Sequence, residues 1–148
     1  MRKLIATFLM VFACISLQAQ YQVFKDLDNG VDNSLHEYIK AQNDLDAKYK
    51  DYTLLNKTIE MGRIDLAKEL INNGADVNLQ TALKSPLVFA TKQGDMELVK
   101  LLIEKGARVD RSYEDDYSLA DLARLRGHLE LATYLSDEIQ KTLKRQGR

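Results

Sequence analysis

The feature that most constrains this chain is a period of roughly 33 residues that runs through much of its length. The octet INNGADVN at 71–78 returns as IEKGARVD at 103–110. A ten-residue block that opens on Thr or Ser and closes on Gly occurs three times, at 53–62, 85–94 and 118–127. Three copies in register predict a repeat protein, in which each unit buries its apolar face only against its neighbours.

Each unit is expected to form two short helices joined by a tight turn. Thr53, Ser85 and Ser118 are residue types that cap the first turn of a helix. Pro86 follows its cap directly, where a missing N–H costs nothing. The glycine that closes the block can take the left-handed conformation that ends the first helix. A second helix follows, as in DMELVKLLIEK of the middle copy, and its wide apolar face suits packing between repeats.

This pattern resembles the ankyrin repeat over about residues 51–136. The middle copy, SPLVFATKQGDMELVKLLIEKGARVD, matches best, whereas the first copy has Leu54 in place of the proline and the third lacks both the proline and the closing GADV. Asn56, Val88 and Asp121 stand where the opening motif of the family has a histidine. The resemblance implies that these replacements weaken the hydrogen bonding between repeats.

The resemblance implies an all-α solenoid of about three helix-turn-helix repeats with capping helices at both ends. The sequence SLHE at 34–37 has the form of a capping box and begins a predicted helix over 34–49, which would cover the first repeat. The expected organisation is a signal peptide at 1–20, an N-terminal segment and capping helix at 21–50, repeats at 51–78, 79–110 and 111–136, and a C-terminal helical extension at 137–148.

The first twenty residues predict export. Arg2 and Lys3 precede an apolar run of about 14 residues and a polar end that contains Ala19, which is the order of a secretory signal peptide. The run is shorter than the roughly 20 residues that span a bilayer. We expect cleavage after Ala19 and a periplasmic or secreted location in a bacterium. VFAC at 11–14 is similar to the lipobox of bacterial lipoproteins, so a lipid anchor on Cys14 is the alternative.

The charge of the processed chain excludes two classes of partner. Removal of 1–20 takes away two basic residues and no acidic ones, which leaves 19 Lys and Arg against 22 Asp and Glu, a net charge of −3. Such a chain has no basic field to attract nucleic acid or an anionic membrane. We expect no nucleic-acid binding and no membrane span.

Catalytic and metal-binding motifs are missing from the sequence. The two histidines, His36 and His128, lie far apart along the chain. His128 stands in GHLE, where the ankyrin motif has its own histidine in a structural role, and His36 is expected to face solvent. We therefore expect no enzyme activity, cofactor or metal. The alternatives are a small envelope hydrolase or metal-dependent enzyme, which would require the two histidines to converge, and a lipid-anchored structural surface protein.

The resemblance implies that the chain, as a monomer, binds one protein partner through its turns and the outward side of its first helices. This chain would act on its partner as an inhibitor, as an immunity factor or as a stabilising protein. Tyrosines are enriched in interfaces, and acidic residues beside them favour a basic patch on the partner. In the alternative, Tyr117 packs on its neighbours. The candidate residues are Tyr113, Glu114, Asp115 and Tyr117 in the turn 111–118, Gln80, Leu83 and Lys84 in the turn 79–85, and Met61, Lys92, Gln93 and Arg126 beside the mid-repeat glycines.

Overall fold

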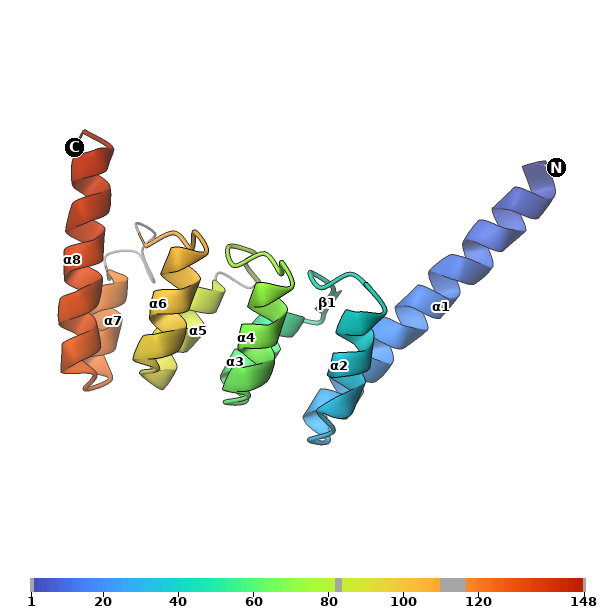
Figure 1. Ribbon diagram of the computed structural model, residues 1–148, viewed down its shortest axis with the longest axis horizontal. Helices are drawn as coiled ribbons and strands as arrows, with labels where there is room; N and C mark the ends of the chain where they lie inside the picture. Colours follow the sequence, from blue (N-terminus) through green and yellow to red (C-terminus); the bar gives the residue numbers. More distant parts are fainter. Residues whose placement is uncertain (1, 82–83, 110–116, 148) are drawn as a thin grey trace.

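The computed structural model describes residues 2–81, 84–109 and 117–147, with their side chains from Ala13 onward. Within these residues the chain forms eight helices and one short hairpin, which confirms the predicted all-α repeat architecture (Figure 1). The elements are α1 Arg2–Asp28, α2 Asn33–Lys40, β1 Lys48–Tyr49, β2 Tyr52–Thr53, α3 Leu54–Glu60, α4 Ile64–Asn72, α5 Pro86–Gln93, α6 Met96–Glu104, α7 Leu119–Leu125 and α8 Leu129–Arg145.

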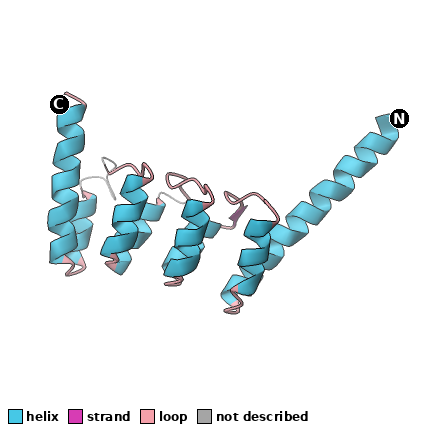
Figure 2. Ribbon diagram, viewed as in Figure 1, coloured by secondary structure: helices cyan, strands magenta, loops and turns pink. Residues whose placement is uncertain are grey.

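The helices stack in two layers. The first helices of the repeats, α3, α5 and α7, contact one another in order, and α2, α4 and α6 form the layer of second helices, with α8 beside α6 (Figure 1). The loops that follow the second helices all lie along one edge of the stack (Figure 2). The stack thus presents a row of loops on one edge and the face of its first helices next to them.

The mid-repeat glycines adopt the left-handed conformation that the sequence predicts, with φ of 69° at Gly62, 77° at Gly94 and 82° at Gly127. At Gly94 a side chain is excluded for a second reason, because a Cβ atom there would overlap the imidazole of His128. The Nε2 atom of this imidazole lies 3.3 Å from the carbonyl oxygen of Lys92. His128 therefore has the structural role that the resemblance implies, since it packs on the end of the preceding repeat.

The helix starts follow the predicted caps with one exception. The Thr53 hydroxyl accepts a hydrogen bond of 3.0 Å from the backbone N–H of Asn56, and Pro86 occupies the first position of α5. Ser85 precedes α5 in extended conformation, but its side chain makes no capping hydrogen bond within the described residues. The fixed φ of Pro86 suits this helix start without the cap.

The predicted helix over 34–49 is wrong, and so is its capping box. Helix α2 begins at Asn33, so Ser34 lies inside the first turn, where its hydroxyl donates to the carbonyl oxygen of Val31 at 3.1 Å. The helix ends at Lys40, and Gln42 then takes a left-handed φ of 53°. This conformation turns the chain out of the helix.

Residues 23–50 instead form an additional repeat-like unit, which we call the N-terminal unit. Its inner residues Val23, Phe24 and Leu27 are buried at the end of α1, which packs on α2. Gly30 has a φ of 76° and precedes Gly62 by one repeat period. The N-terminal unit thus covers the first repeat with the same two-helix architecture rather than with a single long helix.

Polar side chains tie each loop to the unit before it. Asp46 of the N-terminal unit accepts a hydrogen bond of 2.8 Å from the backbone N–H of Asp76. Asn78, which follows Asp46 by one period, accepts one of 3.0 Å from the N–H of Arg108 and donates to the carbonyl oxygen of Gly106 at 2.9 Å. Because these bonds satisfy backbone groups of the loops, they fix the spacing between units.

The expected weakening of hydrogen bonds between repeats is wrong at Asn56. The side chain of this fully buried residue donates from Nδ2 to the hydroxyl of Thr81 at 3.1 Å and to the carbonyl oxygen of Lys84 at 3.4 Å. An amide N–H is as able a donor as an imidazole N–H, so the replacement of histidine keeps the bond to the next repeat.

We predict that Gly94→Ala destabilises the protein more than Gly106→Ala. Both glycines are left-handed, a conformation that costs an alanine about 1–2 kcal/mol. Only at Gly94 must a new Cβ also displace His128, whereas nothing lies within 4 Å of a Cβ at Gly106. The loss of the hydrogen bond to Lys92 adds about 1 kcal/mol. Thermal unfolding followed by circular dichroism measures both variants, and equal losses would contradict this account of His128.

Candidate partner-binding surface

The hairpin at 48–53 and the bridge between Thr81 and Lys84 join successive units, and we call these two turns the first and second fingers. In the first finger, residues 48–53, β1 pairs with β2 in the register Lys48 to Thr53, with the exposed Lys50 and Asp51 at the tip. In the second finger, residues 80–85, backbone bonds of 3.2 and 2.9 Å join Thr81 to Lys84. Both fingers therefore have rigid, hydrogen-bonded bases.

The residues of the second finger that were predicted to bind a partner are partly buried in the fold. Gln80 and Lys84 are half-buried, and the Lys84 carbonyl oxygen accepts the hydrogen bond from Asn56. Leu83 lies outside the described residues. The side chains of Gln80 and Lys84 are available to a partner only in part.

An aromatic side chain, Tyr117, is exposed just before the start of α7. Tyr117 is 51% exposed, so neighbouring residues cover only about half of it. Tyr113, Glu114 and Asp115 lie outside the described residues, and their contact with a partner stays a prediction. A large exposed aromatic residue next to a rigid helix start is a suitable anchor for an interface.

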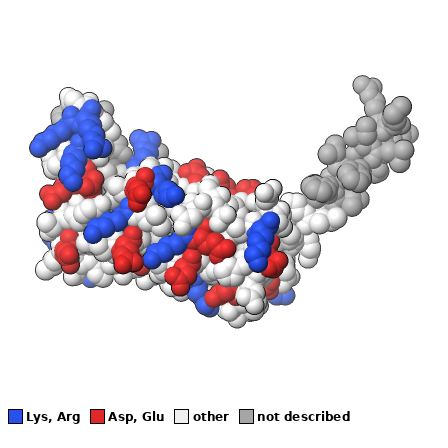
Figure 3. Space-filling view, in the orientation of Figure 1, with Lys and Arg blue, Asp and Glu red and all other residues white. Residues whose placement is uncertain are grey.

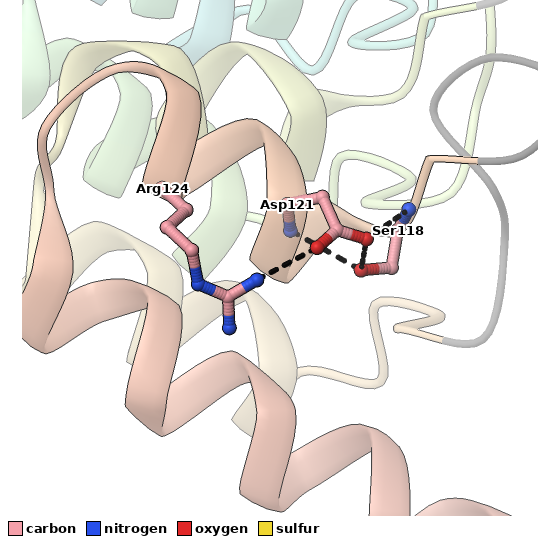
Figure 4. A network of polar contacts seen from close by, with 3 residues as sticks. All are labelled: Ser118, Asp121 and Arg124. Atoms are coloured by element: carbon pink, nitrogen blue, oxygen red, sulfur yellow. Dashed lines mark hydrogen bonds and ion pairs between the residues drawn. The ribbon is translucent and has the colours of Figure 1, made fainter.

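The residue after Tyr117 begins a network that fixes this helix start (Figure 4). The Asp121 carboxylate accepts hydrogen bonds from the Ser118 hydroxyl at 2.6 Å and from the Ser118 backbone N–H at 3.1 Å. Arg124 donates to its other oxygen at 2.7 Å. Hydrogen bonds from these donors, chiefly the one from the Ser118 hydroxyl, hold the pKa of the Asp121 carboxyl below its usual value of 3.8. The capping box thus lies here, at Ser118 and Asp121, and not at Ser34.

The candidates beside the mid-repeat glycines differ in their availability. Met61 is half-buried and packs against the apolar core, and Lys92 is half-buried as well. Gln93 is exposed, but its Nε2 atom donates to the carbonyl oxygen of Glu60 at 3.1 Å, which closes the end of α3. Arg126 is exposed. The structure therefore places Arg126 at the surface and gives Met61 and Gln93 structural contacts.

A cluster of side chains that was not predicted from the sequence lies where the first finger meets the face of the first helices. The Tyr52 hydroxyl donates to Glu60 Oε1 at 2.9 Å, and its ring lies 6.2 Å from that of Phe89, between centroids. Lys57 Nζ lies 5.0 Å from the centre of the Tyr52 ring and 2.7 Å from Asp28 Oδ1. The hydrogen bond to Glu60, and then burial, raises the pKa of Tyr52 above its usual value of 10.0.

A signal for this cluster was present in the sequence. Tyr49 and Tyr52 lie one repeat period before Thr81 and Lys84, the paired residues of the second finger. A helix over 34–49, as predicted, would include Tyr49 and would therefore exclude a hairpin at this position.

The two histidines lie at opposite ends of the stack, His36 in α2 and His128 at the start of α8 (Figure 1). His36 is not simply solvent-facing, because its Nδ1 atom pairs with the Glu69 carboxylate of the next unit. Among the described residues no three His, Cys, Asp or Glu side chains gather as a metal site would require. In the same residues no helix is long and apolar enough to span a bilayer.

Comparison with known proteins identifies the class of protein that this surface belongs to. Residues 55–145 match the family model described as ankyrin repeats in three copies, and the chain belongs to the ankyrin-repeat family. Repeats of this family indicate a protein–protein interaction module, in agreement with the prediction from the sequence.

Three relatives illustrate how widely such modules occur. The chain is 34% identical over 77 residues to the ankyrin repeat and KH domain-containing protein mask-1 of Caenorhabditis elegans, which covers 51% of this chain and 3% of that protein. It is 36% identical over 67 residues to ankyrin repeat domain-containing protein 37 of Xenopus tropicalis, and this match covers 45% of this chain and 41% of that protein. It is 30% identical over 99 residues to the glycerophosphocholine phosphodiesterase gde1 of Schizosaccharomyces pombe, and this match covers 66% of this chain and 8% of that protein. The chain thus spans less than half the length of each of these relatives.

We predict that Asp121→Asn destabilises the protein at neutral pH and not in acid. A carboxyl whose pKa is lowered in the folded state stabilises that state above its unfolded pKa, and this contribution is lost as pH falls through the folded value. The variant should therefore unfold a few degrees below the parent chain at pH 7, and the difference should vanish well below 3.8, the usual value for the carboxyl. Asp137→Asn, at an exposed site on α8, is the control. A difference between parent and Asp121→Asn that persists in acid would rule out the charge as its cause.

Proposed function

We propose that this chain is an exported, non-enzymatic ankyrin-repeat module that holds one protein partner in the periplasm or envelope of a bacterium. The observation that carries the proposal is the pair of fingers between successive units, together with Tyr117, which is 51% exposed just before α7. Tyrosine buries a large area on binding at a low cost in side-chain entropy, which suits it to anchor a partner.

The Tyr52 cluster supports a binding surface that continues from the fingers onto the first helices. It places the half-buried ring of Tyr52 on the buried ring of Phe89 and beside the exposed Glu60, and these contacts hold the Tyr52 side chain in place. Side chains that are already ordered lose less entropy when a partner binds.

The position of the first buried side chain supports export. Residues from Ala13 to Gln18 are exposed, and the first buried side chain among the described residues is Val23. Cleavage after Ala19 would leave Val23, Phe24 and Leu27 in the core of the N-terminal unit. It would also keep the hydrogen bond of 2.8 Å from the Gln20 side chain to the Lys48 carbonyl oxygen.

Two roles are compatible with such a module. It could inhibit an enzyme by covering the active site, as an immunity factor does, or it could stabilise an exported enzyme. Both use the same surface, and they differ in the activity and stability of the partner with and without this chain.

The proposal predicts that Tyr113→Ala combined with Tyr117→Ala lowers partner recovery more than ten-fold. The loss of two aromatic anchors costs at least about 1.4 kcal/mol of binding free energy, which is a factor of ten. The measurement is quantitative mass spectrometry of proteins that the full chain, with a C-terminal tag, captures from an envelope extract of its source organism. Tyr21→Ala, which removes an exposed tyrosine of α1, is the matched control. Capture of no specific protein at low and at physiological salt would count against the proposed function.

The proposal also predicts the N-terminus of the chain in the cell. Mass spectrometry of the protein recovered from the envelope should show a first residue at Gln20, as cleavage after Ala19 requires. A first residue at Cys14 that carries acyl chains would support the lipid-anchored alternative instead. An intact N-terminus at Met1 would remove the argument for export.

A further inference from the structure

Helix α8 is longer than the other second helices. Helices α4 and α6 have 9 residues each, whereas α8 has 17 and is about 25 Å long. The buried residues of α8, Leu131, Ala132 and Leu135, all lie in its first two turns. The rest of α8 therefore extends past the part that is buried in the core of the third repeat.

Helix geometry shows which side of α8 faces the second repeat. Residues three or four apart lie on the same side of a helix. The Tyr134 ring lies 5.5 Å, at its centre, from Lys100 Nζ of α6. Glu138 and Thr142 of α8 line a groove together with the loop 106–109. Tyr134, Glu138 and Thr142 therefore lie on the side of α8 that faces the second repeat.

The row of residues on the opposite side of α8 is uncharged. At about 100° of rotation per residue, this side is reached at alternating steps of four and three residues. Such steps are typical of a helix that packs along another helix. We call this row the outer stripe, and it consists of the exposed Leu129, Thr133 and Gln140 and the half-buried Ser136 and Leu143.

Exposed leucines indicate that the third repeat packs against something. Leu125 and Leu129 are 71% and 66% exposed, whereas the described residues of the first two repeats, 51–81 and 84–109, contain no exposed large apolar side chain. Ile64 and Met96, which have the position of Leu129 in α4 and α6, are half-buried and pack against the core. The outer side of a repeat needs polar residues to remain soluble when nothing covers it. The leucines of the third repeat therefore fit a covered surface.

The charges beside the outer stripe have opposite signs at the two ends of α8. Glu130 lies in the first turn and Lys144 in the last turn, on the same flank of the stripe. Both side chains are exposed, and neither has an ion-pair partner among the described residues. Asp137, midway between them, interacts with Lys141 of its own helix. Figure 3 shows Lys and Arg side chains gathered over the C-terminal end of α8. Such a helix is complementary in charge to a second copy that runs in the opposite direction.

We propose that two copies of this chain pair through the outer stripes of their α8 helices, which lie antiparallel about a two-fold axis near Ser136. Leu129 of one copy then packs on Leu143 of the other, and the small Ser136 side chains let the helices approach closely. Each Glu130 faces Lys144 of the second copy, whereas a parallel pair would bring both Glu130 residues to the same end. The pair replaces the monomer expected from the sequence. This inference goes beyond the proposed function, since it concerns how two copies meet and not what they hold.

The first test is sedimentation equilibrium of the full chain without a tag. The chain should show a reversible equilibrium of monomer and dimer with a Kd between about 1 and 100 µM, as expected for a small interface. Leu129→Arg with Gln140→Arg places like charges in the stripe and should weaken pairing at least ten-fold. Ile15→Arg with Leu17→Arg adds the same charge at exposed sites on α1 and should leave pairing unchanged. A chain that stays monomeric at about 500 µM would overturn the proposal and leave the outer stripe to a different protein.

Charge reversal tests the antiparallel direction. Glu130→Lys alone and Lys144→Glu alone should each weaken pairing about ten-fold, because like charges then face each other across the axis. The two substitutions combined should restore pairing, since opposite charges meet again. Circular dichroism checks that α8 keeps its helical signal, because both changes oppose the helix dipole. A folded double variant that pairs no better than the single variants would rule out this arrangement.

Disulfide formation tests the position of the axis. In chains with Cys14→Ser, which removes the single native thiol, Ser136→Cys should give a linked dimer on mild oxidation, because the axis brings the two residues together. Leu129→Cys should not, because its two copies are separated by about 20 Å along the helices and a disulfide requires Cα atoms within about 7 Å. The measurement is the rate at which the linked dimer appears on a non-reducing gel. Equal rates for the two variants would contradict the antiparallel pair.

Discussion

No repeat of this protein can bury its apolar surface without a neighbour, and the rest of the structure follows from that constraint. Leu55, Leu87 and Leu98 are each 1% exposed or less, although the units that contain them are only two short helices. At roughly 25 cal/mol per Å² of apolar surface, burial between units is the main contribution that holds them together. Units that pack in a single direction bring the described loops after the second helices to the same edge, so packing alone produces this row of loops.

Hydrogen bonds between units fix the positions of the packed units relative to one another. Apolar contacts between helices tolerate small shifts, whereas a hydrogen bond to a loop backbone does not. Asp46, Asn56 and Asn78 each reach from one unit to the backbone of the next. At the end of the stack Asp121, which occupies the position of Asn56 in its repeat, binds Ser118 and Arg124 of its own repeat. The carboxylate at this position in the third repeat thus bonds within its own repeat.

Much of the fold was predictable because its signals are local and repeat with the period. Thr53, Pro86 and the left-handed glycines act through their own backbone conformation, which a sequence reveals directly. The N-terminal unit escaped prediction because Gln42 takes the left-handed turn that glycine takes in the other units. The bond from Asn56 depends on which residues of different units meet, and local sequence does not encode that. The structural contact of Gln93 is of the same kind, since its side chain donates to the Glu60 carbonyl oxygen of a different repeat.

The bonds to the loops have a direction along the chain. Asp46 precedes Asp76, the residue it holds, and Asn78 precedes Gly106 and Arg108. A chain is synthesised from its N-terminus, and domains fold as they emerge. Each acceptor has therefore left the ribosome before the loop that it will bind, and the same order holds if the chain crosses a membrane N-terminus first. Each new loop finds its hydrogen-bond acceptor already synthesised, so the polar contacts of the stack can form in order from its N-terminal end.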